Sequence, residues 1–281
     1  VRVALTGADP LSAVEEAVAG VLPEHREKWA TVLHPSWTPD QATEANGAVW
    51  PTLGSAVWAL RVSSSFEQAM RRVVDLGGDT DTVAAVTGGL AGAVHGITGI
   101  PIRWASAVHG SLPGFDPPVS HLGDLHRLAA RLDGDPSGPH EPEPTRGLEP
   151  REVVDGVWAS DLDGARASDR DFAVISLCRT GGSFGHPIQR FAYLADDESN
   201  DDVARVLADV LGDIEALRAD GKRVLVHCLG GASRTGLVLR AWAIRERGLS
   251  VGEATGLVAD RWPQLGLWNA SFDRALHTLA R

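Results

Sequence analysis

A cysteine and an arginine six positions apart, Cys228 and Arg234, are the residues of this 281-residue sequence best suited to chemistry on a phosphate group. The cysteine follows the apolar run 224–226, which predicts a buried central strand, and the pattern after the arginine predicts a helix. Glycines between the two allow a sharp turn, so that backbone N–H groups at the helix N-terminus can attract an anion. The same surroundings favour the reactive thiolate of the cysteine. The spacing therefore predicts a phosphate site that contains a nucleophile.

The segment from His227 to Thr235 resembles the signature loop of cysteine-dependent protein phosphatases, particularly of the dual-specificity type, and every fixed position of that pattern is matched. The resemblance implies that Cys228 attacks phosphorus, that Arg234 binds two phosphate oxygens with its planar fork, and that Thr235 hydrogen-bonds the sulfur. It implies that the phosphate lies against Leu229, Gly230, Gly231, Ala232 and Ser233. The residue before the nucleophile normally hydrogen-bonds the loop, so His227 is expected to be structural.

A general acid must protonate the leaving oxygen, and two neighbouring carboxylates could do so. The resemblance implies an aspartate in a loop about thirty residues before the cysteine, which corresponds to Asp196. Asp197 is the second candidate. Acidic residues are dense from 196 to 202, and such a stretch is commonly a solvated loop followed by helix-start charges. The sequence leaves open which carboxylate acts.

The elements predicted around this loop belong to an α/β domain, and the resemblance implies a central, mostly parallel sheet. Residues 172–177 are apolar and rich in β-formers, so we expect a core strand there. Apolar residues recur at helical spacing over 201–220, and the turn at Asp220-Gly221 leads into the strand before the cysteine. Three more helices are expected: one that ends at Gly248, one that runs from a capping box at Ser250 to Trp262, and one that contains Phe272 and Leu279.

A second group of oxygen-bearing side chains, Asp79, Asp81 and Thr82, stands at the start of a predicted helix. Hard oxygen ligands suit Mg²⁺ or Mn²⁺ rather than a soft metal. Helix capping is the alternative, because Asp and Thr are favoured N-caps. The helix behind the motif is rich in glycine, which predicts close helix packing and a central, buried position. The glycines concerned are Gly88, Gly89 and Gly92.

This stretch resembles the C-terminal metal motif of ADP-ribosylglycohydrolases, an all-helical family that removes ADP-ribose at a two-metal centre. The likeness covers roughly residues 40–115, including the segment 46–51 and a helix from Ser65 to Leu76. It implies that Asp79, Asp81 and Thr82 are metal ligands. The family's other ligands, a Thr-Asp-Asp cluster and an acidic residue near its own N-terminus, have no counterpart here. We therefore expect a partial metal centre, with glycohydrolase activity belonging to a longer parent protein.

The sequence predicts two domains joined by a linker. Residues 1–133 are expected to be an all-α, ADP-ribosylglycohydrolase-like domain that a helix with Leu122, Leu125, Leu128 and Leu132 closes. Residues 134–150 contain five prolines and no apolar periodicity, which predicts an extended linker. Residues 151–281 are expected to be the α/β phosphatase-like domain. A hydrophobic content of 43% is enough for two cores.

Composition restricts the partners. The net charge is −11 and no basic stripe is visible, which argues against nucleic acid or an anionic membrane. No segment approaches the roughly 20 apolar residues that span a bilayer, and no signal pattern opens the chain, so we expect a cytoplasmic protein. A nucleophilic Cys228 requires a reducing compartment. A reversible bond to Cys178, the other cysteine, is a minor alternative.

The expected function is hydrolysis of phosphate monoesters, without a cofactor, on a phosphorylated protein or a small phosphoester. A phosphoinositide phosphatase would add lysines to the loop, and residues 229–232 carry no charge. A rhodanese-type sulfur transferase would not need the Arg234-Thr235 pair. A phosphate-binding pseudoenzyme that recognises phosphorylated or ADP-ribosylated proteins stays open, as does ADP-ribosylglycohydrolase activity as the main function.

Overall fold

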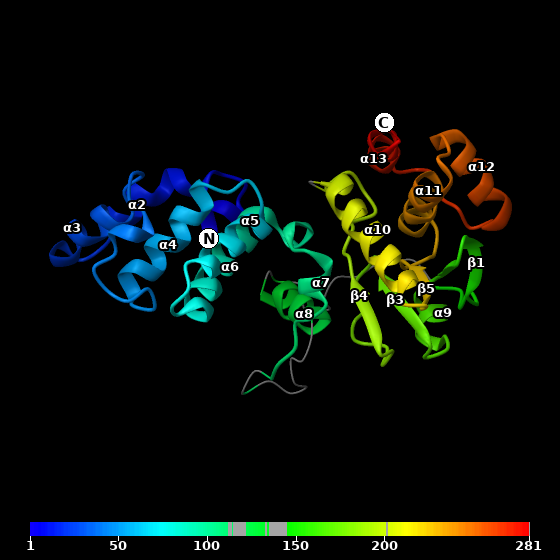
Figure 1. The fold of residues 1–281 in the computed structure, drawn as a ribbon, viewed down its shortest axis with the longest axis horizontal. Coiled ribbons are helices and arrows are strands. Elements are labelled where there is room, and N and C mark those ends of the chain that lie inside the picture. The colour runs from blue at the N-terminus through cyan, green and yellow to red at the C-terminus, as the bar shows by residue number, and fades with distance from the viewer. Residues whose placement is uncertain (112–113, 115–121, 133, 135–144, 201, 281) are drawn as a thin grey trace. The chain divides into compact units, whose positions relative to one another are not determined.

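The computed structural model describes residues 1–281 apart from 112–113, 115–121, 133, 135–144, 201 and 281 (Figure 1). The chain forms two compact units, Val1–Ile100 and Pro101–Arg281. Within the described ranges, no helix combines the length and the apolar character needed to cross a membrane.

The first unit is helical, and the structure describes no strand in it. Its helices are α1 (Arg2–Leu5), α2 (Val14–Ala19), α3 (Pro23–Val32), α4 (Val49–Arg61), α5 (Phe66–Asp75) and α6 (Thr80–His95), with 3₁₀ turns at Pro10–Ala13, Pro39–Gln41 and Ile97–Gly99. Helices α4, α5 and α6 pack against one another. Small and β-branched side chains fill the space between them, namely Ala56, Ala59, Ala69, Val73 and Val83. The all-α prediction for this part of the chain is confirmed.

The burial of α6 corrects one sequence prediction. Its buried residues recur every four positions and form one face, which consists of Val83, Thr87 and Ala91. A Cβ added at Gly88 would lie 3.6 Å from Met70 of α5, but nothing lies within 4 Å of a Cβ at Gly89 or Gly92. The last two glycines lie off the packed face, so close packing does not explain them. The prediction that all three glycines bury the helix was wrong.

The second unit contains a five-stranded sheet in the order β1-β2-β5-β3-β4. Its strands are β1 (Arg151–Val154), β2 (Val157–Ser160), β3 (Phe172–Ser176), β4 (Ile188–Phe191) and β5 (Arg223–His227). Strand β1 pairs antiparallel with β2, and the remaining pairs are parallel. Residue Ser176 of β3 is level with His227 of β5, so the carboxyl ends of these strands meet at one edge. The predicted central strand and mostly parallel sheet are confirmed.

Helices cover both faces of this sheet (Figure 1). They are α7 (Ile102–Ala105), α8 (Leu122–Leu132), α9 (Leu162–Ala167), α10 (Val203–Ala219), α11 (Ser233–Arg247), α12 (Val251–Arg261) and α13 (Ala270–Leu279). Successive residues of β5 point to opposite faces: Val224 and Val226 lie in the large core with α10 and α11. Leu225 lies in a smaller cluster with Ala165 of α9. The sheet is buried on both sides, as parallel sheets usually are.

The structure confirms where the helices after the predicted phosphate loop (residues 228–234) begin and end. Helix α11 stops at Gly248, whose φ of +64° is the left-handed conformation that glycine adopts readily. Ser250 and Glu253 form the predicted capping box of α12, and Trp262 follows its last residue.

The sequence predicts a domain boundary at about residue 133, but the two compact units meet at Ile100 and Pro101. Ile102 of α7 is buried in the core of the second unit, and its N–H donates to Asp209 of α10 at 2.6 Å. The ring of His126 in α8 contacts Tyr193, with 5.9 Å between ring centroids. Both helices therefore pack with the α/β unit. An apolar helix face shows that a helix is partly buried but not which core buries it.

Most of the predicted linker lies outside the described residues, but its last part packs on the second unit. The N–H groups of Arg146 and Leu148 donate to the carboxylate of Asp161 at 2.6 and 3.0 Å. Asp161 also caps α9 by accepting from Gly164 N at 2.8 Å. This carboxylate is fully buried and accepts three backbone hydrogen bonds.

Candidate active site

Cys228 directly follows β5, the middle strand of the sheet, and lies at the carboxyl edge where ligands bind in open parallel sheets. Its side chain is in the core, with 2% of the residue exposed. The chain then forms a short loop and enters α11, a helix of 15 residues. Arg234 and Thr235 stand in the first turn of this helix and are 4% and 0% exposed. The predicted strand, loop and helix are therefore present, and the positive end of the helix dipole faces the loop.

Three contacts fix the shape of this loop. Gly231 has φ +69°, and a Cβ there would lie 2.9 Å from the carbonyl oxygen of Ser160. The indole N–H of Trp262 donates to the Gly231 carbonyl at 2.7 Å. The N–H of Leu162 donates to the Leu229 carbonyl at 3.0 Å. The loop is thus held from both flanking elements, the β2–α9 connection and the end of α12.

A buried hydrogen-bond chain positions His227. Burial lowers the pKa of this imidazole to about 4, so the ring is neutral at physiological pH. Its Nδ1 lies 3.1 Å from the Cys228 carbonyl, which can only accept, so Nδ1 carries the proton. Nε2 therefore accepts from the hydroxyl of Ser176 at 2.8 Å. The structural role expected for this histidine is consistent with these contacts.

The chain continues through β4. The side-chain amide of Gln189 donates to Ser176 Oγ at 3.1 Å, and its carbonyl oxygen accepts from Phe184 N at 2.9 Å. Every donor in the series has one acceptor, so the series has a single direction and fixes the tautomer of the imidazole. Strands β3, β4 and β5 are thereby linked to the backbone of the nucleophile residue.

Arg234 and Asp196 meet over the loop. The guanidinium Nε lies 3.8 Å from Asp196 Oδ2, and a terminal N–H donates to the Leu194 carbonyl at 3.3 Å. The Asp196 side chain is 27% exposed, so the carboxylate stands at the boundary between the buried loop and solvent. The structure thus brings together residues that lie far apart in the sequence.

Two asparagines hold the loop that carries Asp196. Asn200 bonds both the N–H and the carbonyl of Ala195, at 2.8 and 2.9 Å. Asn269 donates to the carbonyl of Asp197 at 2.9 Å. The Asp197 carboxylate accepts from Ser199, and these hydrogen bonds, more than the charge of Arg234, lower the pKa of Asp197. Of the two acidic candidates, Asp196 is the one whose carboxylate lies against the arginine.

Buried polar atoms without a hydrogen-bond partner gather at this place. Among the described residues they include Asp196 Oδ1, Ser233 Oγ and Thr235 Oγ1. Buried polar groups are normally satisfied, so exceptions at the start of α11 and in the loop that carries Asp196 indicate a site that a ligand completes. The predicted bond from Thr235 to the sulfur is not formed in this structure, and that role stays a prediction. Cys178 and Cys228 are both buried free thiols, not a disulfide.

The acidic motif of the first unit serves as a helix cap. Asp79 precedes α6, and its Oδ1 accepts from Thr82 N at 3.3 Å. Hydrogen bonds from Thr82 lower the pKa of Asp79. The segment 46–51 meets this motif, since Asn46 accepts from Asp79 N at 2.9 Å and a Cβ at Gly47 would clash with the carboxylate. The alternative of capping is therefore realised.

A metal centre needs more ligands than this motif supplies. Asp79, Asp81 and Thr82 offer two carboxylates and one hydroxyl, and the described residues contain no group of three His, Cys, Asp or Glu side chains that could hold a metal ion. These residues do not fit a complete two-metal centre.

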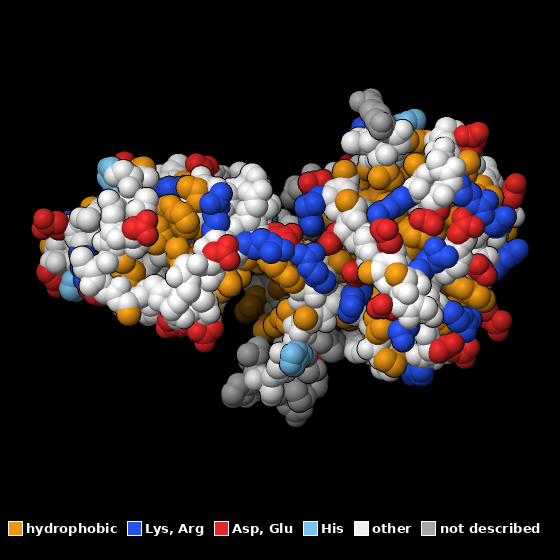
Figure 2. Space-filling model, viewed as in Figure 1, with side chains coloured by type: hydrophobic (Ala, Val, Ile, Leu, Met, Phe, Trp, Pro, Cys, Tyr) orange, Lys and Arg blue, Asp and Glu red, His pale blue; other side chains and the backbone are white. Residues whose placement is uncertain are grey.

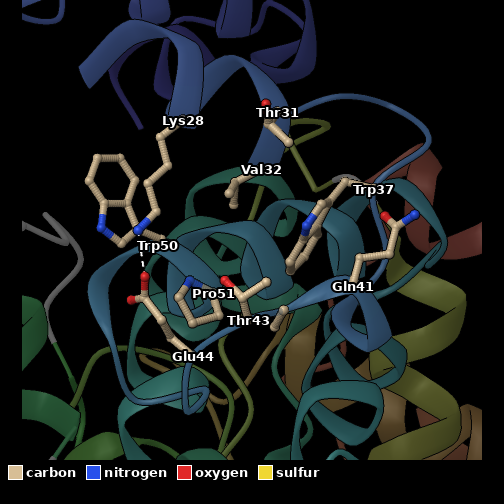
Figure 3. Close-up of a pocket in the computed structure, with 10 residues that line it drawn as sticks. Lys28, Thr31, Val32, Trp37, Gln41, Thr43, Glu44, Trp50 and Pro51 are labelled. Carbon is tan, nitrogen blue, oxygen red and sulfur yellow. Dashed lines mark hydrogen bonds and ion pairs between the residues drawn. The ribbon is translucent and has the colours of Figure 1, made fainter. Parts of the chain in front are cut away.

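A small cavity of about 170 Å³ lies elsewhere in the first unit (Figure 3). Trp37 and Trp50 stand on its two sides, and the dashed line in Figure 3 marks the ion pair between Lys28 and Glu44. The Lys28 ammonium also lies 4.5 Å from the centre of the Trp50 ring. None of the residues predicted to do chemistry lines this cavity.

Several residues of the site escaped the sequence analysis. Asn200, Asn269, Gln189 and Trp262 all bond backbone or side chains that belong to the loops around Cys228. Nothing in the sequence indicated the partner of Asn269, which lies 72 positions before it. Gln189 and Trp262 find partners 13 and 31 positions away in the chain, which local patterns do not report. Asn200 bonds Ala195 only five positions before it, but nothing in the sequence indicated that contact.

Two family models match the chain. Residues 1–141 match the family described as ADP-ribosylglycohydrolase, and residues 174–281 match the dual specificity phosphatase catalytic domain. The first match runs past the compact first unit and includes α7 and α8. The sequence boundary and the packing boundary therefore differ.

Known proteins resemble each part separately. ADP-ribosylarginine hydrolase Tri1 of Pseudomonas putida is 33% identical over 38% of this chain and 28% of its own length. The putative tyrosine phosphatase 123R of invertebrate iridescent virus 6 is 28% identical over 47% of this chain and 96% of its own. The crystal structure of human DUSP28 covers 49% of this chain and 97% of its own, with 21% identity and a TM-score of 0.44. The chain thus spans little more than a quarter of the curated hydrolase.

Proposed function

Since this chain belongs to the ADP-ribosylglycohydrolase family through residues 1–141 and carries a dual specificity phosphatase catalytic domain over residues 174–281, we propose that it hydrolyses phosphate monoesters through a phosphocysteine intermediate. One observation carries the proposal. Cys228 and Arg234 flank a buried loop at the carboxyl edge of the sheet, and the carboxylate of Asp196 lies 3.8 Å from the arginine. Nucleophile, anion clamp and acid are then in one place.

In the proposed complex the substrate phosphate lies in the loop 229–233, against the backbone N–H groups at the start of α11. Arg234 binds two of its oxygens, because a planar guanidinium matches a phosphoryl group with two parallel hydrogen bonds. Ser233 Oγ and Thr235 Oγ1 are buried and have no partner among the described residues, so both can hydrogen-bond the bound group or the sulfur. Transfer of a phosphoryl group needs mainly this positioning and charge stabilisation.

The first step forms a bond between Cys228 Sγ and phosphorus and breaks the ester bond to the leaving oxygen. Asp196, in its acid form, gives its proton to that oxygen, and the alcohol departs. In the second step a water molecule attacks the phosphocysteine while the Asp196 carboxylate takes its proton. The S–P bond breaks, inorganic phosphate leaves and the thiolate is restored. Neither step uses a metal or an organic cofactor.

The acid role can be assigned with a matched pair of variants. Asp196→Asn is expected to lower kcat by about 10²-fold on an aryl phosphate with a poor leaving group, and much less on one with a good leaving group. Asp197→Asn is the control, because its carboxylate bonds Ser199 rather than facing the arginine. Steady-state rates on both esters measure the effect. Equal losses in both variants, or a loss independent of the leaving group, would exclude this assignment.

The substrate class we propose is a phosphorylated protein or a small phosphoester. The loop residues 229–232 bring no lysine that would grip a polyanionic head group. On the face of the second unit shown in Figure 2, acidic and basic side chains are interspersed rather than gathered in a basic stripe. An ADP-ribosylated protein could be a further partner through the helical unit. We keep the cytoplasm as the proposed location.

For the helical unit we propose that Asp79, Asp81 and Thr82 supply part of a Mg²⁺ or Mn²⁺ site. Because two carboxylates and a hydroxyl leave most of the coordination to water, Mg²⁺ is expected to bind this chain with a Kd above about 1 mM. Calorimetry with Mg²⁺ and Mn²⁺ measures it. Asp81→Asn should remove the weak heat, and Asp75→Asn, at the exposed end of α5, should not. Tight binding of two ions would contradict the partial site.

A further inference from the structure

The segment between α12 and α13 touches both walls of the candidate active site. At its start, Trp262 donates to the carbonyl of Gly231 at 2.7 Å. At its end, Asn269 donates at 2.9 Å to the carbonyl of Asp197, the residue after the proposed acid Asp196. Between them, Leu265 lies over the first turn of α11, where a Cβ at Gly236 would come within 2.3 Å of its methyl group. The segment 262–269 therefore follows the rim of the site from one loop to the other.

Two large apolar side chains on this segment are left in solvent. Leu267 is 56% exposed and Trp268 is 59% exposed. The indole folds back over Gly266, where any Cβ would overlap the ring, so the glycine is needed to hold the indole in place. Trp268 directly precedes Asn269, whose side-chain amide donates to the backbone of residues 195–200, here called the acid loop because it carries Asp196. An exposed apolar pair thus stands on the segment that joins the two loops of the candidate site, and the protein gains nothing by exposing it to water.

The charges around the pair restrict what could cover it. Glu198 is 62% exposed and pairs with Arg274 of α13 at 3.4 Å, while Asp196 and Asp197 precede it in the acid loop. The carboxylates among these described residues outnumber the one cation, Arg274, so a second phosphate group of a polyanion is disfavoured here. An uncharged apolar group that enters with the phosphate suits both the pair and the acidic rim.

We propose that Leu267 and Trp268 form an apolar wall that receives a hydrophobic side chain next to the phosphorylated residue of a protein substrate. The inference rests on the proposed phosphatase function and narrows its substrate class to phosphoproteins with an apolar flanking residue. Such a contact lies outside the phosphate loop, so it selects among substrates without taking part in the bond changes. Leu267 and Trp268 are accordingly specificity-determining residues, and Asn269 is a positioning residue for the acid loop.

The test compares three probes on the whole chain. They are a phosphotyrosine peptide flanked by leucines, the same peptide flanked by serines, and N-acetyl-phosphotyrosine amide, which has no flanking residues. Burial of one leucine side chain corresponds to about a tenfold preference in kcat/KM, expressed mainly in KM. The unchanged protein should therefore prefer the leucine peptide over the serine peptide by about tenfold.

Trp268→Ala should abolish this preference and leave kcat/KM for the amide within about twofold, because the amide cannot reach the wall. Leu132→Ser removes an exposed apolar residue elsewhere in the unit, 81% exposed, and should change none of the three values. Equal rates on both peptides in the unchanged protein, or a preference that persists in Trp268→Ala, would overturn the inference. So would a loss on all three probes in Trp268→Ala, which would mean that the indole only supports the acid loop.

The outcome separates the two proposals. If the unchanged protein hydrolyses none of the three probes, the proposed phosphatase function fails. If it hydrolyses the amide but does not distinguish the peptides, the function stands and only the apolar wall is rejected.

Discussion

Replacing Cys228 with serine is expected to lower kcat/KM on an aryl phosphate by at least about 10⁴-fold. Serine keeps the shape of the side chain but offers a hydroxyl, which at neutral pH is almost entirely protonated and cannot form the phosphocysteine. The residue is 2% exposed at the end of β5, and replacing sulfur with oxygen there removes little volume. The fold should therefore persist. Steady-state hydrolysis and thermal unfolding of the same preparations measure the two effects.

Two further measurements make this result specific. Mass spectrometry of the unchanged protein quenched during turnover should detect one phosphate on the peptide that contains Cys228, and none in the variant. Cys178→Ser is the control, since that thiol is also buried but precedes no phosphate loop, and its activity should stay within a few-fold of the unchanged protein. Full activity of Cys228→Ser would reject the phosphocysteine mechanism.

Replacing Arg234 with lysine is expected to lower kcat/KM by about 10³-fold although the charge is kept. An ammonium group cannot bind two phosphate oxygens in parallel, and its shorter reach also forfeits the contacts with the Leu194 carbonyl and Asp196. These contacts place the guanidinium before the substrate arrives, so their loss also disorders the clamp. The loss should appear in kcat as well as in KM, because the clamp binds the transferring group most tightly in the transition state.

Helix α11 contains a matched control. Arg240 is also buried, 2% exposed, but it bonds Gly236 and Asp273 rather than the phosphate loop. Arg240→Lys should reduce thermal stability and leave kcat/KM within a few-fold. Binding of vanadate or inorganic phosphate should weaken in Arg234→Lys alone. Equal catalytic losses in both variants would mean that the lysine acts by destabilising the helix.

The part of the site that the sequence predicted is the part that is continuous in the chain. A strand, a loop and a helix follow one another over Val224 to Arg247, so periodicity and glycine positions were enough to place Cys228 and Arg234. The same holds for α12, whose capping box is entirely local. The fold class followed from the order of these elements and from the family resemblance.

The parts of the site that the sequence did not predict depend on contacts outside this continuous stretch. The backbone conformation of residues 195–197 decides whether Asp196 or Asp197 faces the arginine. Asn200 and Asn269 hold this backbone by donating to the carbonyls of Ala195 and Asp197. Neighbouring side chains leave the backbone in different directions, and no spacing rule states which one points inward. The buried serine and glutamine that orient His227 could not be predicted either, because each finds its partner across the sheet.

The buried carboxylate of Asp161 bears on where the α/β domain begins. Two of its three backbone donors, Arg146 and Leu148, precede the first strand, and the next residue, Leu162, holds the phosphate loop at Leu229. A chain cut at the start of β1 would leave that carboxylate without most of its partners, one residue away from a support of the loop. The end of the predicted linker, which contains Arg146 and Leu148, is therefore a structural part of the α/β domain. A shortened version of this domain, or one fused to another protein, has to keep these residues.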